Sequence, residues 1–210
     1  MIMRSSTVRV FACSPRASGN TDLMVHNFVQ GVRSAGGSAE VTYLRDYTVL
    51  PCAVCHYCAE EPHANCLLSK RDDAETLFRQ IEEAPLVCMV SPIFFYHLPA
   101  QFKCLIDRAQ RYWVLRQRQL NSSPDWQAPP SRPGLIGLVA ARTRGEKLFE
   151  GSMLTLKYFF DLFNIRVVEG CQLMGYDQPD DLARDGVACM RLYEMGVKAT
   201  ALVAEHAGQR

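Results

Sequence analysis

The sequence lacks the features that mark a membrane or a secreted protein. The longest apolar run is APLVCMV, from Ala84 to Val90, which is far below the ~20 residues that a membrane-spanning helix needs. The N-terminus shows no apolar segment followed by a cleavage site, and the nine cysteines are an odd number, which disfavours a disulfide framework. We therefore expect a cytoplasmic protein whose thiols are reduced or bind metal, with no membrane partner.

An excess of either charge is also missing. The formal net charge is +1 over 210 residues, so no bulk field attracts nucleic acid or anionic lipid. We predict no nucleic-acid partner and expect binding to depend on a local site. A chain of this length buries one good core, which predicts a single domain over residues 1–210.

Internal repeats and β-hairpin signals are absent as well, and apolar runs instead alternate with helical periodicity. Strands are predicted at 7–13, 39–44, 85–91, 135–141 and 165–173, and helices at 21–36, 72–84, 99–117, 151–163 and 180–206. The alternation predicts an α/β sandwich with a five-stranded parallel sheet. Two segments stand apart, a cysteine-rich loop at 51–66 and a Pro-rich insertion at about 117–133. The insertion is longer than usual and is interpreted as a lid or an interface element.

Ligands of such sheets sit outside the carboxyl ends of the strands, which directs attention to the loop after the first strand. Its hydroxyl, guanidinium and amide groups precede a helix N-terminus and predict a phosphate cradle, formed by Ser14, Arg16, Ser18, Asn20 and Thr21. The alternative is an ordinary turn with an Asn20 or Thr21 cap. The loop has neither G-x-G-x-x-G nor the lysine of a P-loop, which favours a monophosphate.

The loop after the third predicted strand is apolar and aromatic from Pro92 to Tyr96. Such a loop at the mouth of a sheet suits a planar heteroaromatic ring, and the predicted ring contacts are Pro92, Ile93, Phe94 and Phe95. The alternative is that these side chains form core or dimer contacts. A monophosphate at one end and a flat ring at the other together predict FMN. Arg142 and Thr143, after the fourth strand, are further candidates for the edge of this pocket.

Four cysteines follow the pattern C-x2-C-x2-C-x7-C at Cys52, Cys55, Cys58 and Cys66. Two-residue gaps let three thiolates converge on one small inorganic core, as in the related run of bacterial ferredoxins, so an iron-sulfur cluster is the first interpretation. Zinc with His56 or His63 in place of one thiolate is the second. Reduced thiols without metal are the third.

The motifs SPRASGNT, PCAVCHYC and SPIFFYHLPAQFKCLIDR together resemble the NADPH-dependent FMN reductase superfamily, and especially its iron-sulfur flavoprotein branch. The resemblance spans about Val8 to Arg108. It implies a flavodoxin-like three-layer sandwich with strand order 2-1-3-4-5, FMN phosphate in the first loop, and a [4Fe-4S] cluster on the four cysteines. It also implies a homodimer or homotetramer.

The function expected from this resemblance is electron transfer from NAD(P)H through FMN and the cluster to one-electron acceptors, with a nicotinamide donor or ferredoxin as partner. No catalytic acid or base is assigned, because the cofactor carries the chemistry. Two alternatives remain, a clusterless NAD(P)H-dependent FMN, quinone, nitro or azo reductase and a non-enzymatic electron carrier or redox sensor. The basic series Arg108, Arg111, Arg116 and Arg118 is interpreted as a solvated helix face.

Overall fold

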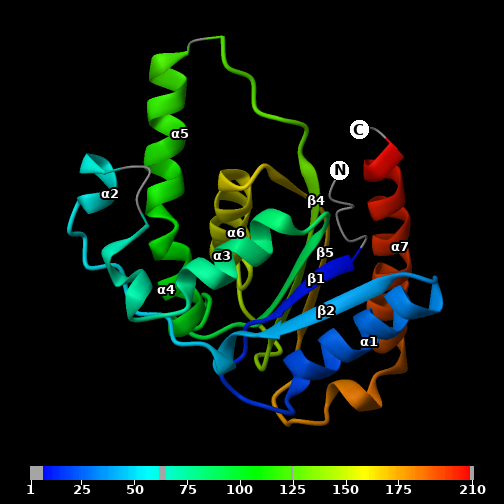
Figure 1. The fold of residues 1–210 in the computed structure, drawn as a ribbon. Helices are drawn as coiled ribbons and strands as arrows, with labels where there is room; N and C mark the ends of the chain where they lie inside the picture. The colour runs from blue at the N-terminus through cyan, green and yellow to red at the C-terminus, as the bar shows by residue number, and fades with distance from the viewer. Residues whose placement is uncertain (1–6, 62–64, 124, 209–210) are drawn as a thin grey trace.

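Five parallel strands form the centre of the molecule in the order β2-β1-β3-β4-β5 (Figure 1). The computed structural model describes residues 7–61, 65–123 and 125–208. Its strands are β1 (Thr7–Ala12), β2 (Ser38–Tyr43), β3 (Val87–Pro92), β4 (Arg132–Ala140) and β5 (Ile165–Met174). The predicted α/β class, the parallel sheet and its strand order are confirmed.

Helices cover both faces of this sheet (Figure 1). One face carries α1 (Asn20–Ser34) and α7 (Gly186–Gly208). The other face carries α3 (Ala74–Glu83), α4 (Ala100–Arg108), α5 (Gln110–Ser122) and α6 (Glu150–Leu162). A short helix, α2 (Tyr57–Glu60), lies in the cysteine-rich segment beside α5. In the described part of the chain, no helix has the length and apolarity that crossing a membrane requires.

The sheet separates two apolar cores because successive side chains of a strand point to opposite faces. Phe11 and Met89 pack on the side of α3 to α6, whereas Val10 and Cys88 pack on the side of α1 and α7. β3 is buried on both faces, which explains why its sequence is a continuous apolar run.

Glycine allows α1 and α7 to approach each other closely. A Cβ atom on Gly31 would lie 1.9 Å from the carbonyl oxygen of Tyr193, and one on Gly196 would lie 2.0 Å from that of Phe28. No side chain fits at those separations, so the backbones of the two helices pack directly against each other.

The helix predicted at 99–117 is instead two helices. The chain tightens at Ala109, whose N–H group donates to the carbonyl oxygen of Ile106 at 3.0 Å, and α5 then continues to Ser122. The predicted Pro-rich insertion at about 117–133 therefore begins as helix.

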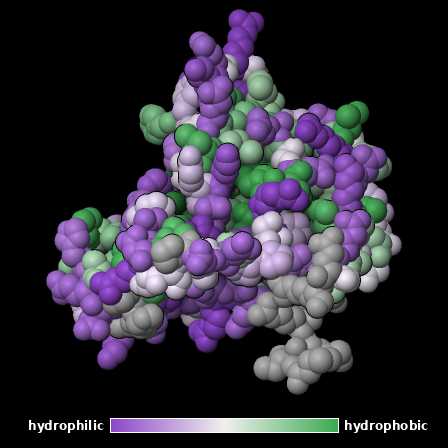
Figure 2. Space-filling model, turned by 90° about the horizontal axis from the view of Figure 1, so that it is seen from above, coloured by the Kyte–Doolittle hydropathy of each residue, from purple (hydrophilic) through white to green (hydrophobic). Residues whose placement is uncertain are grey.

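The position of this insertion argues against the predicted lid. The segment leads into Arg132, the first residue of β4, and so lies at the amino ends of the parallel strands. Ligand sites of such sheets lie at the opposite edge. Figure 2 views this end of the molecule and shows hydrophobic patches set among hydrophilic side chains. The large apolar side chains of Leu120 on α5 and Tyr158 on α6 are exposed at this end. We therefore keep the interpretation of the insertion as an interface element.

Candidate functional site

Three of the predicted loops leave the same edge of the sheet. The N–H group of Cys13 donates to the carbonyl oxygen of Val90 at 2.8 Å, and that of Ile93 donates to Val139 at 2.8 Å. The loops after β1, β3 and β4 are thereby neighbours at the carboxyl ends of their strands. The strand order reverses between β1 and β3, which is where ligands bind in open α/β sheets.

The loop after β1 is organised around the start of α1. Ser14 is buried, and its Oγ accepts a hydrogen bond from the N–H group of Arg16 at 3.1 Å. Ser18 has a left-handed φ of 56°, and its N–H group donates to the carboxylate of Asp22 at 2.8 Å. A Cβ atom on Gly19 would lie 2.9 Å from Nε of Arg16, so this guanidinium lies over the helix N-terminus. The guanidinium group and the N-terminus of the helix both favour a bound anion.

Asn20 has a structural role that its sequence position did not suggest. Its Nδ2 donates to the carbonyl oxygens of Tyr176 at 3.2 Å and Gln178 at 2.7 Å, and its Oδ1 accepts from the N–H group of Leu182 at 3.1 Å. The side chain thus ties the start of α1 to the loop after β5. Thr21 beside it is buried.

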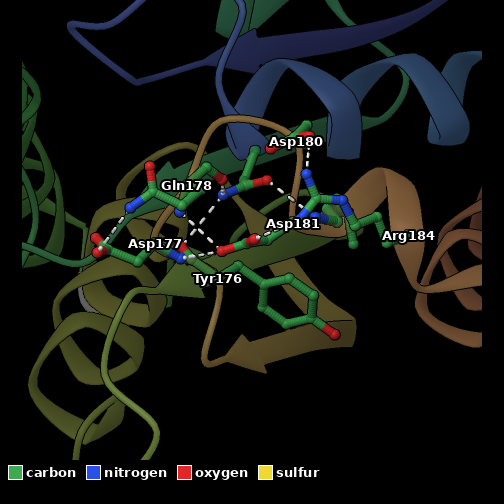
Figure 3. A network of polar contacts seen from close by, with 8 residues as sticks. Tyr176, Asp177, Gln178, Asp180, Asp181 and Arg184 are labelled. Carbon is green, nitrogen blue, oxygen red and sulfur yellow. Dashed lines mark hydrogen bonds and ion pairs between the residues drawn. The ribbon is translucent and has the colours of Figure 1, made fainter.

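The loop after β5 has its own polar network (Figure 3). Asp181 accepts from the N–H groups of Asp177 at 2.8 Å and Gln178 at 2.7 Å, and Arg184 pairs with Asp180 and Asp181. The network fixes the carbonyl groups that Asn20 binds. Local sequence carried no signal for the bonds from Asn20 to this loop, because the bonded residues are more than 150 positions apart.

The aromatic loop after β3 ends in a tight turn. The N–H and C=O groups of Phe94 and His97 bond each other at 2.8 and 2.9 Å, and the two residues between them, Phe95 and Tyr96, have φ values of 49° and 65°. Aromatic residues rarely adopt this left-handed conformation, and such strain concentrates at functional sites. Phe95 is fully exposed. Ile93, in contrast, packs against the core.

The loop after β4 contacts the aromatic turn through Arg142. The guanidinium carbon of Arg142 lies 5.3 Å from the ring centroid of Tyr96, within the range of a cation–π interaction. The Nε2 atom of His97 lies 3.2 Å from Oγ1 of Thr155 on α6, which fixes the other side of the turn. Thr143 lies beside Gly175 instead. Of the two predicted residues, Arg142 is the one joined to the aromatic turn.

The four predicted cysteine ligands line a single cavity of about 410 Å³, together with Arg108 and Arg111. Each two-residue gap of the motif contains one left-handed residue, Val54 with φ 51° and His56 with φ 58°. A β-branched residue at positive φ is a genuine outlier. These turns direct the intervening thiols toward the same cavity.

The thiols share this cavity without being close enough for metal coordination. Within residues 7–61, 65–123 and 125–208, no three His, Cys, Asp or Glu side chains are placed to hold a metal ion. The pKa of Cys58 is raised, first by burial and further by the charges of Cys52, Cys55 and Cys66. Four thiols that line one cavity are the donor set that an iron-sulfur cluster requires. His63, the alternative zinc ligand, lies outside the described residues.

The basic series on α4 and α5 is not a uniformly solvated face, although Arg118 is exposed. Arg108 is buried and paired with Asp72, Arg111 pairs with Glu75 at 2.9 Å, and Arg116 pairs with Asp161 at 2.6 Å. The fourth member, Arg118, donates to the carbonyl oxygen of Ala59 in the cysteine segment. Each guanidinium finds its acceptor on an element remote in sequence, and periodicity cannot reveal such a partner.

Comparison with known proteins finds relatives among iron-sulfur flavoproteins. One from Methanocaldococcus jannaschii is 32% identical over 97 residues, 46% of this chain and 48% of that protein. One from Archaeoglobus fulgidus is 29% identical over 99 residues, 47% and 43% of the two chains. The chain spans about half the length of the curated relatives it matches.

Solved structures similar to this fold include a flavone reductase, with a TM-score of 0.67, 11% identity and coverage of 97% of this chain and 65% of that one. An NAD(P)H:quinone oxidoreductase from Methanothermobacter marburgensis has a TM-score of 0.63 at 18% identity, covering 92% and 96%. These likenesses support the flavodoxin-like fold. The family model of the NADPH-dependent FMN reductases matches residues 6–147, which is more than half of the sequence, and the chain therefore belongs to that family.

Proposed function

We propose that this protein is an FMN-binding oxidoreductase of the iron-sulfur flavoprotein type. It moves electrons between a two-electron donor such as NAD(P)H and one-electron acceptors. The observation that carries the proposal is the placement of Cys52, Cys55, Cys58 and Cys66 around one cavity in a chain of the FMN reductase family. The relatives named as iron-sulfur flavoproteins support it.

In this proposal the loop after β1 holds the FMN phosphate. The hydroxyl groups of Ser14, Ser18 and Thr21 and the first backbone N–H groups of α1, Asn20 included, supply hydrogen bonds. Arg16 supplies the positive charge, because its guanidinium already lies over Gly19 at the helix N-terminus. Helix N-termini favour anions through free N–H groups and the helix dipole.

The aromatic turn holds the isoalloxazine ring. Pro92 and Ile93 form the base of the ring site, and Phe94 and Phe95 offer exposed aromatic surface. Arg142 orients the turn through Tyr96, and Thr143 closes the edge near the loop after β5. The residues bind, orient and shield the ring, and no side chain serves as general acid or base.

The four cysteines hold a [4Fe-4S] cluster, which supplies one-electron transfer when bound. The four thiolates would hold the cluster at the cavity that they line. FMN held by the loops after β1 and β3 would supply two-electron chemistry with a nicotinamide donor, and the partner would be a one-electron acceptor such as ferredoxin. We also propose a homodimer or homotetramer of single-domain chains in the cytoplasm, with the hydrophobic patches at the amino end of the sheet (Figure 2) available for subunit contacts.

The first test is the composition of protein purified without oxygen. Flavin, iron, acid-labile sulfide and zinc are quantified for each chain, and an absorption spectrum is recorded. We expect one FMN with about four iron and four sulfide. Zinc in place of iron, or flavin alone, would contradict the cluster assignment, and a protein without flavin would contradict the whole proposal.

The phosphate assignment has a separate test. Arg16→Ala should weaken FMN binding about tenfold, because a charge-assisted hydrogen bond contributes roughly 1.5–3 kcal/mol. Arg33→Ala is the matched control, since Arg33 is exposed at the opposite end of α1. Quenching of flavin fluorescence measures both affinities. Equal affinities in the two variants would remove Arg16 from the site.

A clusterless reductase of quinone, nitro or azo substrates is the second candidate. The observation that favours it is the spacing of the thiols, which leaves no described group of three ligands ready for a metal. In that case the cysteines are reduced thiols, and the aromatic turn contacts the substrate beside the flavin. Steady NAD(P)H consumption with a quinone by protein that contains FMN and no iron would establish this candidate.

A further inference from the structure

Two arginines at the cysteine cavity have donors that the protein does not satisfy. Arg108 and Arg111 both line the cavity. Nε of Arg108 and Nε of Arg111 are buried, and neither has a hydrogen-bond partner among the described residues. A buried N–H group without an acceptor is costly, and native structures rarely leave one.

The terminal nitrogens of these guanidinium groups already have acceptors, one of which is Oδ1 of Asn65 in the cysteine segment, 3.5 Å from Nη1 of Arg111. The terminal nitrogens of Arg108 donate to Asp72 and, at 3.2 Å, to the carbonyl oxygen of Leu50. Nη2 of Arg111 lies 2.9 Å from the carboxylate of Glu75 and 3.1 Å from the hydroxyl of Tyr112. The carboxylates therefore fix both planar groups and leave Nε without an acceptor in each case.

The cavity lining includes four sulfur atoms as possible acceptors, beside the side chains of His56, Asp107 and Gln110. Four of its lining residues are the cysteines of the motif, and the carboxylates that the arginines contact are already used. Arg108 and Cys66 both line this cavity. Bound sulfur is negatively charged and accepts hydrogen bonds from N–H groups, and such bonds set the reduction potential of iron-sulfur centres.

We propose that Arg108 and Arg111 are positioning residues that donate Nε–H···S hydrogen bonds to an iron-sulfur cluster on the four cysteines and raise its reduction potential. This inference rests on the proposed function. Asp72 and Glu75 hold the donors in place and neutralise their charge. Because the charge is neutralised, the effect depends on the directed N–H group rather than on the net charge of the pair.

That distinction selects the variants. Arg111 is the better test residue, because it is half-buried whereas Arg108 is fully buried in its ion pair. Arg111→Gln removes the charge and the Nε–H group, and Arg111→Lys keeps the charge but has no Nε–H group. Arg116→Gln is the control, since Arg116 lies on the same helix and also pairs with a carboxylate, that of Asp161, outside the cysteine cavity.

The experiment is a redox titration of each protein, monitored by electron paramagnetic resonance, after iron and sulfide have been quantified. We expect both Arg111 variants to load iron and to titrate at a lower potential than wild type, and Arg116→Gln to match wild type. A loaded Arg111→Lys protein with the wild-type potential would overturn the inference and leave the proposed function intact. Wild-type protein with flavin and no iron would overturn both, and this result is read before any variant is made.

A second measurement needs no variant. In reduced wild-type protein, electron–nuclear double resonance before and after transfer to deuterated buffer detects exchangeable protons coupled to the cluster. We expect such protons from the two Nε–H groups. Their absence would overturn the inference even where an Arg111 variant fails to fold or to load.

Discussion

Replacing Phe95 by asparagine should raise the stability of the protein and lower its affinity for FMN. The turn at Phe95 and Tyr96 requires positive φ at both positions, at 49° and 65°. Two-residue turns of this kind strongly favour Asn-Gly, because those residues tolerate the left-handed conformation. The Phe95 ring is fully exposed, so its removal sacrifices no core packing.

The expected gain follows from the cost of this conformation. An ordinary L-residue pays roughly 1–2 kcal/mol in the left-handed region, and asparagine pays less because its side chain bonds locally. Phe95→Asn should therefore raise the free energy of unfolding by about 1 kcal/mol, which corresponds to about 2–4 °C in Tm for a chain of this length. Phe95→Leu keeps the strained backbone without the ring and should show no gain.

Chemical denaturation of flavin-free protein compares the three stabilities, and fluorescence titration compares their FMN affinities. Both variants lack an aromatic ring at the proposed flavin site, so each should bind FMN about fivefold more weakly, the equivalent of about 1 kcal/mol. If Phe95→Asn has no higher free energy of unfolding than Phe95→Leu, the argument from backbone strain is refuted. Wild-type affinity in both variants would refute the contact between Phe95 and the ring.

Three further predictions concern packing, charge and pH. Gly196→Ala should lower the free energy of unfolding by about 1–3 kcal/mol in guanidinium denaturation, because a Cβ there would lie 2.0 Å from a carbonyl oxygen of α1. Gly208→Ala is the control and should leave the free energy of unfolding unchanged, because Gly208 has open space around it. Asp72→Ala should cost about 3–5 kcal/mol in the same assay, since it leaves a buried guanidinium unpaired. Burial and a hydrogen bond to Asp185 raise the pKa of Tyr176 to about 12 from 10, so stability should fall between pH 10 and 12, and Tyr176→Phe should flatten part of that fall.

The sheet and its strand order could be predicted because periodicity and family motifs both report on the core. β3 and β4 are apolar on both faces and read as strands without any tertiary information. The division of one predicted helix at Ala109 could not be predicted. Its cause is the packing of Ala109 and Arg108 into the core, and the local sequence continues a helical pattern across the break.

The candidate site was predictable where a loop carries its own chemistry and unpredictable where a partner comes from elsewhere. The four cysteines lie within 15 residues of one another in the sequence, and this close spacing explains why they line one cavity. The sequence suggested Asn20 as a phosphate ligand, but its side chain forms hydrogen bonds with backbone groups of the loop after β5. Arg108 looked solvated, but its carboxylate partner lies 36 residues earlier in the chain.

Hydrogen bonds hold the chain on both sides of the cysteine motif. Before the motif, the N–H groups of Thr48 and Leu50 bind the carboxylates of Asp73 and Asp72 at 2.8 and 3.0 Å. After it, the carbonyl oxygen of Cys66 accepts from the N–H group of Ser69 at 2.8 Å. Among its described residues, the segment between these bonds has two left-handed residues, Val54 and His56. On the proposed function, this segment would rearrange to bring the four thiols onto a cluster, whereas the two arginines that line the cavity are held by Asp72, just before α3, and by Glu75 in its first turn.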